Sequence, residues 1–175
     1  MDDDDLRARL EALFVAHART VLLYARRRTD HATAADVLSE VFVIAWQRSE
    51  EIPADALPWL LGCARRTLLN QQRSRRRRSR LIERLAASTP EASFAIEIDH
   101  DGGLAEALSA LSERDREVLL LTAWEGLSAE QAARALGCST RALWVRSHRA
   151  RKRLRAALDR ADPPTTPLRM EACND

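Results

Sequence analysis

Seven basic side chains without an intervening acid lie close to the end of this chain, at Arg141, Arg146, Arg149, Arg151, Lys152, Arg153 and Arg155. Guanidinium groups donate in pairs to phosphate oxygens and to the edges of bases, so this stretch is suited to contact with nucleic acid. We expect a helix here with contacts to duplex DNA at Arg141, Trp144, Arg146 and Arg149. The alternative for the whole stretch is a basic helix that only faces solvent. The alternative for Trp144 is that its side chain covers the core of the domain.

The residues before this basic stretch predict a helix-turn-helix. Ser128 can cap a helix, and Gln131 stands three residues on, where a capping box places its reciprocal partner. Gly137 supplies the left-handed backbone that ends a helix, and Ser139 or Thr140 can cap the next one. A short helix, a tight turn and a basic second helix are typical of DNA-binding proteins.

Charge is distributed in four blocks of alternating sign, although the whole chain carries a net charge of only +2. Residues 1–58 hold 7 bases and 11 acids, and residues 59–96 hold 9 bases and 2 acids. The pattern repeats with 3 bases and 9 acids in residues 97–140, then 9 bases and 4 acids in residues 141–175. Such blocks favour two basic faces for nucleic acid and acidic faces for a different partner, rather than ordinary solvated helices.

A paired acidic site is predicted on the second helix, which we expect from about Ala34 to Gln47. Asp36 and Glu40 are four residues apart and therefore share one face, where they can contact a basic partner or simply face solvent. Phe42 and Trp46 lie on the apolar stripe, which predicts core positions for both.

The third helix begins near Pro58 and runs into the basic arm Arg73 to Arg80. Its candidate contacts to single-stranded nucleic acid are Trp59, Arg65, Arg66, Asn70 and Arg73. Trp59 can stack on an extruded base or pack in the helix corner. The run Arg75 to Arg78 favours sequence-independent contact with phosphates, with a solvated arm as the alternative.

These patterns predict an all-α protein of two small helical domains, residues 1–87 and 104–160, joined by a flexible linker at 88–103 and followed by a disordered tail at 161–175. The three cysteines, Cys63, Cys138 and Cys173, are far apart, without the spacing of a zinc site or a disulfide framework. We expect no metal, no cofactor and no catalytic residue. The lack of a signal peptide or an apolar run of spanning length predicts a cytoplasmic protein without direct membrane insertion.

Three motifs resemble those of bacterial RNA polymerase sigma factors of the extracytoplasmic-function (ECF) group. The sequence from Asp36 to Trp46, DVLSEVFVIAW, is similar to the family pattern D-L-V-Q-E-T-F-x-x-A-W, and WLLGCARR from Trp59 is similar to W-L-x-x-I-A-R-N. Towards the C-terminus, Arg146, Arg149, Ala150 and Arg151 match R-x-x-R-A-R. Arg66 replaces a usual Asn, Arg141-Ala142 replaces Gly-Thr, and Ser147 replaces Leu.

The resemblance implies a region 2 domain and a region 4 domain. Region 2 of the family binds the clamp helices of core RNA polymerase, here through Asp36 and Glu40, and the minus-10 element, here through Trp59, Arg65, Arg66, Asn70 and Arg73. Region 4 binds the flap and the minus-35 element, here through Arg141, Trp144, Arg146 and Arg149. The implied partners are core polymerase, promoter DNA and an anti-sigma factor.

A different class of protein also fits part of the pattern. A two-domain transcriptional regulator would bind duplex DNA through residues 104–160 and would use its first half only for interaction. An enzyme is disfavoured, because the chain has no Gly-rich phosphate loop, no metal-ligand set and no nucleophile with a spaced base.

Overall fold

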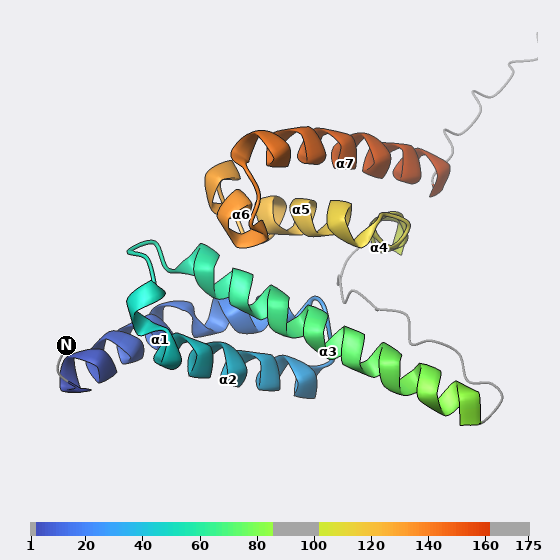
Figure 1. The fold of residues 1–175 in the computed structure, drawn as a ribbon. Helices are drawn as coiled ribbons and strands as arrows, with labels where there is room; N and C mark the ends of the chain where they lie inside the picture. Colours follow the sequence, from blue (N-terminus) through green and yellow to red (C-terminus); the bar gives the residue numbers. More distant parts are fainter. Residues whose placement is uncertain (1–2, 86–101, 162–175) are drawn as a thin grey trace, which may run out of the picture.

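The computed structural model describes residues 3–85 and 102–161, and every regular element in these two ranges is a helix (Figure 1). The first range holds α1 (Asp3–Arg26), α2 (His31–Gln47) and α3 (Leu57–Leu85), with a short 3-10 helix, η1 (Ser49–Glu51), before α3. α1, α2 and α3 pack against one another as a three-helix bundle, and α3 continues beyond it. The all-α prediction is therefore confirmed for the part of the chain described.

The second range holds α4 (Gly102–Ser109), α5 (Glu113–Ala123), α6 (Ala129–Leu136) and α7 (Thr140–Ala161). α7 packs along α4 and α5, and α6 forms the corner that connects α5 to α7. Together α6 and α7 form the helix-turn-helix that the sequence predicts. The predicted linker falls mostly on residues 88–101, and the predicted tail on residues 162–175, both outside the described residues.

Local side-chain chemistry fixes the helix ends. The Ser128 side chain accepts from the backbone N–H of Gln131 at 3.1 Å, and the Gln131 side chain accepts from the Ser128 backbone at 3.0 Å, so the capping box is confirmed. Gly137 ends α6 at φ 65°, in the left-handed region. Ser139 caps α7, since its hydroxyl accepts from the Ala142 N–H at 3.2 Å.

Two helices begin earlier than the sequence predicts. α2 starts at His31 because the Asp30 carboxylate accepts from both the backbone N–H and the hydroxyl of Thr33, at 2.9 and 2.7 Å. These hydrogen bonds lower the pKa of Asp30 to about 2. α4 starts at Gly102, inside the predicted linker, since burial of Ala107 and Leu108 outweighs the weak helix preference of two first-turn glycines.

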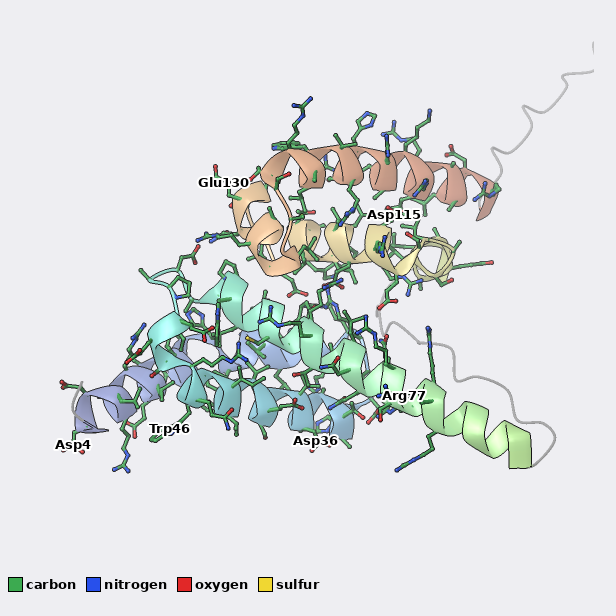
Figure 2. The ribbon with its side chains drawn as sticks, viewed as in Figure 1. Asp4, Asp36, Trp46, Arg77, Asp115 and Glu130 are labelled. Atoms are coloured by element: carbon green, nitrogen blue, oxygen red, sulfur yellow. The ribbon has the colours of Figure 1, made fainter. Side chains whose placement is uncertain are left out.

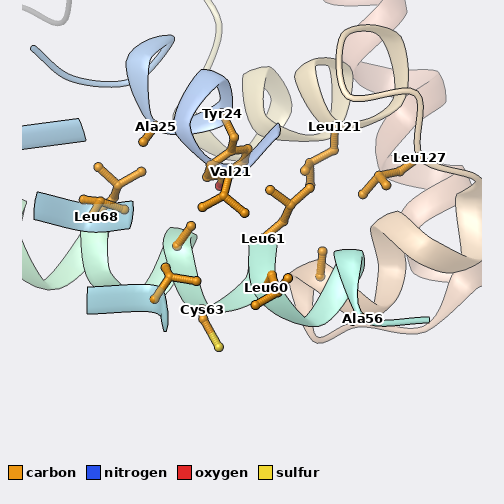
Figure 3. Close-up of a cluster of buried hydrophobic side chains, with 14 of the residues drawn as sticks. Val21, Tyr24, Ala25, Ala56, Leu60, Leu61, Cys63, Leu68, Leu121 and Leu127 are labelled. Carbon is orange, nitrogen blue, oxygen red and sulfur yellow. The ribbon is translucent and has the colours of Figure 1, made fainter. Parts of the chain in front are cut away.

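One apolar core runs through both halves of the molecule (Figure 3). Leu61 of α3 lies beside Leu121 of α5, and Val21 and Tyr24 of α1 border the same cluster. A smaller cluster within the second half gathers Leu108, Leu111, Leu119 and Ala150. The second half therefore has a core of its own and also shares one with the first.

Candidate nucleic-acid and polymerase interfaces

The outer face of α7 is open to solvent at the positions that the sequence predicts for DNA contact. Arg141, Trp144 and Arg149 are exposed, with 60% of Trp144 accessible, while Arg146 is half-buried. α7 lies on the side of α5 away from α3, so this face points away from the three helices of the first half (Figure 1). An exposed aromatic ring among guanidinium groups can contact phosphates and base edges at the same time.

The inner face of α7 explains why some of its residues are not available for DNA. Leu143 and Ser147 are buried, and Ala150 belongs to the smaller core cluster. Arg153 forms an ion pair with Asp115, which is buried on α5. The charge of Arg153 is thus partly neutralised within the domain, which leaves the residues nearer the N-terminus of α7 as the better candidates for DNA contact.

The candidate residues on α3 occupy two environments. Arg66, Asn70 and Arg73 are exposed, whereas Trp59 and Arg65 are half-buried. Trp59 packs against the shared core, which supports the packing alternative for its ring. The five residues therefore share one helix but do not share one level of exposure.

Arg66 is folded back onto its own helix. Its Nη2 donates to Sγ of Cys63 at 3.1 Å. Burial raises the pKa of the Cys63 thiol, although the nearby Arg66 charge acts in the opposite direction. Cys63 is therefore a buried thiol of the core.

The far end of α3 projects past the bundle as a basic arm (Figure 2). Arg76, Arg77 and Arg78 are exposed along it. Arg75 is held against α2, where its Nη2 donates to Thr33 Oγ1 at 2.6 Å and lies 3.8 Å from the Asp30 carboxylate. Three guanidinium groups of the arm are thus accessible to phosphates, and the fourth fixes the arm to the bundle.

Asp36 and Glu40 are both exposed on α2, and Figure 2 shows Asp36 on the side of α2 that points away from α3. The prediction that Trp46 is a core residue is wrong, because 44% of this side chain is exposed. The buried stripe of α2 runs through Val37, Val41 and Ala45, and Trp46 lies one position farther round the helix.

Apolar side chains adjoin this acidic pair. Val43 is exposed, and the ring of Phe42 meets that of Phe14 of α1 edge to face with centroids 4.8 Å apart. Phe14 is itself 48% exposed. The outer face of α1 and α2 thus combines two carboxylates with exposed aromatic surface, a composition typical of protein interfaces. Helical spacing alone does not reveal that Trp46 contributes to this surface.

A buried charged cluster joins α1 to α5, and no sequence pattern points to it. The hydroxyl of Tyr24 donates to Glu117 at 2.6 Å, and Nε of Arg28 donates to the other oxygen of Glu117 at 2.8 Å. Glu125 accepts from Arg27 at 2.7 Å and from Arg28 at 3.3 Å. Burial raises the pKa of Tyr24 well above its ordinary value, and Glu117 acts in the same direction. These partners are 89 to 98 residues apart in the sequence.

Within the described residues, these features define a helical protein with a helix-turn-helix and an exposed basic helix in its second half and an acidic and aromatic surface on its first. Two family models match it in the same order. Residues 13–78 match Sigma-70 region 2, and residues 102–154 match Sigma-70, region 4. The second match begins at Gly102, where α4 begins.

Curated relatives agree with the family models. The chain is 34% identical over 158 residues to the ECF RNA polymerase sigma factor SigL of Mycobacterium tuberculosis, a match that covers 86% of this chain and 89% of SigL. It is 34% identical over 131 residues to the ECF RNA polymerase sigma factor SigD of the same organism, covering 70% of this chain and 62% of SigD. The chain belongs to the ECF sigma factors.

Solved structures show the same fold. The sigma factor RpoE in complex with the anti-sigma factor NepR from Bartonella quintana superposes with a TM-score of 0.65 at 23% identity, covering 85% of this chain and 96% of that one. CnrH in complex with the cytosolic domain of CnrY superposes with a TM-score of 0.62 at 26% identity, covering 88% and 90%. Within the described residues, no helix is long and apolar enough to cross a bilayer.

Proposed function

We propose that this protein binds core RNA polymerase and directs transcription to specific promoters, with α2 as the polymerase contact and α3 and α7 as the DNA contacts. The observation that carries the proposal is the placement of these surfaces. Asp36 points away from α3, and α7 lies on the far side of the second half (Figure 2). Glu40 is also exposed and shares the helix face of Asp36, four residues before it. One molecule can therefore hold polymerase and DNA on different faces.

The polymerase contact combines charge with apolar surface. Asp36 and Glu40 supply negative charge for the basic surface of a partner helix, and Val43 and Trp46 supply exposed apolar area beside it. Buried aromatic anchors surrounded by charged groups typically carry most of the affinity of a protein interface. We therefore add Trp46 to Asp36 and Glu40 as a polymerase-binding residue.

The DNA contacts divide between the two basic helices. We assign the minus-10 element to Trp59, Arg65, Arg66, Asn70 and Arg73 on α3, and the minus-35 element to Arg141, Trp144, Arg146 and Arg149 on α7. Arg76, Arg77 and Arg78 add sequence-independent contacts to phosphates. The protein acts as a binding and positioning factor in the cytoplasm, and no catalytic step is assigned to it.

An anti-sigma factor is the further partner that we propose. RpoE of Bartonella quintana was solved with the anti-sigma factor NepR, and CnrH with the cytosolic domain of CnrY, and both share this fold. A partner of this class would act by covering the surfaces assigned here to polymerase or to DNA.

Run-off transcription with purified core polymerase on a genomic promoter library tests the proposal. We expect discrete start sites with the wild-type chain and loss of initiation with the double variant Asp36→Arg and Glu40→Arg, whose binding to duplex DNA should persist. The double variant Asp4→Arg and Glu11→Arg is the matched control, because both residues are exposed on α1 and the charge change is the same.

Two outcomes would contradict this assignment. Normal initiation by the Asp36 and Glu40 variant would show that α2 is not the polymerase contact. Absence of initiation by the wild-type chain, with duplex binding intact in a mobility-shift assay, would favour a regulator that uses only residues 104–160.

A further inference from the structure

A cavity of about 220 Å³ lies where α5, α6 and α7 of the second half meet. Leu127, Leu143 and Ser147 line its inner part and are all buried. Trp144 and Arg151 also line it, and both side chains are exposed. The cavity therefore has a buried floor and opens at the surface of α7, between an indole ring and a guanidinium group.

The sequence of α7 explains why there is space at this point. Leu143, Ser147 and Arg151 follow one another at steps of four residues, so they share one face of the helix. Ser147 is 4% exposed and stands where the sigma factor pattern has Leu. A small side chain at a buried position leaves a cavity wherever its surroundings do not collapse onto it. The cavity is thus a property of this chain.

The size and the apolar lining of the cavity suit one aromatic ring. An apolar cavity of about 150 Å³ is large enough to hold a benzene molecule, so this one has room for a ring with a small substituent. Leu127 and Leu143 supply apolar floor, and the indole of Trp144 supplies a face on which a ring can stack. Small-molecule sites typically combine such surface with a few polar groups.

The charge of the lining selects an anion. Over the described ranges, Arg151 is the one charged side chain of the wall, and no carboxylate accompanies it. A guanidinium group can donate two parallel hydrogen bonds to a carboxylate. The hydroxyl of Ser147 adds a further donor within the wall. A cation would find no counter-charge here, whereas a carboxylate would.

We propose that this cavity binds a small aromatic carboxylate, with its ring against Trp144, Leu127 and Leu143 and its carboxylate at Arg151. Such a ligand would occupy one face of Trp144 and place negative charge on the surface of α7. Because Trp144 is assigned here to promoter DNA, the bound acid would lower the affinity of α7 for duplex DNA. This last step rests on the proposed function, and the binding of the acid does not.

A titration of the full chain with benzoate tests the site. In proton–nitrogen correlation NMR, we expect shifts at the indole N–H of Trp144 and the backbone N–H of Ser147, and none at the indole N–H of Trp59. A ligand of this size should bind with a dissociation constant of about 1 mM or below. Benzamide has the same shape without the charge, and should bind about three- to five-fold more weakly, since one exposed ion pair contributes little more.

Cavity-filling variants show where the benzoate binds. Ser147→Leu fills the cavity from α7 and should abolish binding, whereas Ala156→Leu adds the same side chain at an exposed position of α7 and should not. If Ser147→Leu loses helix content by circular dichroism, Ala129→Leu fills the cavity from α6 instead. Arg151→Gln should make benzoate and benzamide bind equally, while Arg155→Gln, an exposed arginine outside the lining, should preserve the difference.

A second readout measures competition with DNA. Fluorescence anisotropy with a labelled duplex of mixed sequence should show weaker binding in the presence of benzoate. At ten times its dissociation constant, benzoate should weaken duplex binding by up to about ten-fold, the limit for complete competition. Acetate at the same concentration controls for the effect of salt on phosphate contacts. The Ser147→Leu chain should show no effect of benzoate beyond that of acetate.

Absence of shifts at Trp144 and Ser147, or equal benzoate binding by the wild type and both cavity-filling variants, would overturn the site. Benzoate binding confined to the wild type and the Ala156→Leu control, with unchanged duplex affinity, would support the site and overturn its competition with DNA. Failure of the proposed function is distinguishable, because it would abolish promoter-specific initiation in run-off transcription while leaving the benzoate shifts and their loss in Ser147→Leu intact.

Discussion

α3 and α7 are both long, arginine-rich helices, yet most of the candidate DNA-binding residues on α7 are exposed, whereas those on α3 divide between exposed and half-buried positions. The outer face of α7 carries the exposed residues Arg141, Trp144 and Arg149. On α3, Trp59 and Arg65 are half-buried beside the close approach of α6 to Gly62, whereas Arg66, Asn70 and Arg73 are exposed. Similar composition thus gives two different levels of access to DNA, because packing decides which part of a basic helix can be reached.

The apolar sides of the two helices differ in which core they join. α7 buries Leu143 in the shared core and Ala150 in the smaller cluster of the second half. α3 buries Leu60, Leu61 and Ala64 in the shared core. A substitution that leaves a cavity at these positions of α3 should therefore weaken the contact between the two halves, because that contact is made through the shared core.

The largest expected effect is on stability, from Leu61→Ala. This side chain is 1% exposed and lies beside Leu121, so its truncation should lower the free energy of unfolding by about 2–5 kcal/mol. Urea denaturation followed by circular dichroism measures the change. Val15→Ala is the control, because Val15 is 86% exposed and should change stability by less than about 0.5 kcal/mol. Equal effects of the two substitutions would contradict the shared core.

The next effect concerns α7. Arg141→Ala with Arg146→Ala should weaken binding of the protein to its upstream duplex element by about 1–3 kcal/mol for each arginine that pairs with a base. Arg66→Ala with Arg73→Ala on α3 should leave this duplex binding unchanged and instead reduce initiation by the polymerase complex. Mobility-shift titration and run-off transcription separate the two results. A reversed pattern would show that α3, not α7, is the accessible reader.

A smaller effect is expected from the arm of α3. Arg76→Gln, Arg77→Gln and Arg78→Gln should weaken binding equally across sequences and lower the slope of log affinity against log salt by about 1 for each arginine that pairs with a phosphate. Arg75 is left intact because it holds the arm to Thr33. The triple variant Arg7→Gln, Arg19→Gln and Arg114→Gln gives the same charge change elsewhere on the surface. A change of sequence preference in the arm variant would contradict a sequence-independent role.

The smallest effect is expected at the cap of α6. Ser128→Ala removes one half of the capping box and should lower the free energy of unfolding by about 1 kcal/mol. Ser74→Ala on the exposed side of α3 should change it much less. Thermal unfolding checks both. Because α6 also covers α3, a Ser128→Ala chain with unchanged stability would show that the cap does not hold this helix in place.

Local signals in the sequence predict most of the elements correctly. The capping box at Ser128 and the left-handed Gly137 are chemical features of neighbouring residues, so they can be recognised without tertiary information. The predicted start of α2 falls a few residues late because the Asp30 cap acts through Thr33, a pairing that the apolar stripe does not reveal. The core prediction for Trp46 fails because helical spacing defines a face only to within about one position.

The helices, their order, the two basic stretches and the acidic pair on α2 follow from the amino-acid sequence alone, since caps, periodicity and charge are properties of residues a few positions apart. In contrast, the reach of Arg28 to Glu117 and Glu125, which are 89 and 97 residues away, is visible only once the chain is folded. The same is true of the approach of Gly62 to Ala135. These contacts depend on how two apolar surfaces fit together, and the spacing of apolar residues on one surface does not specify the shape of the other.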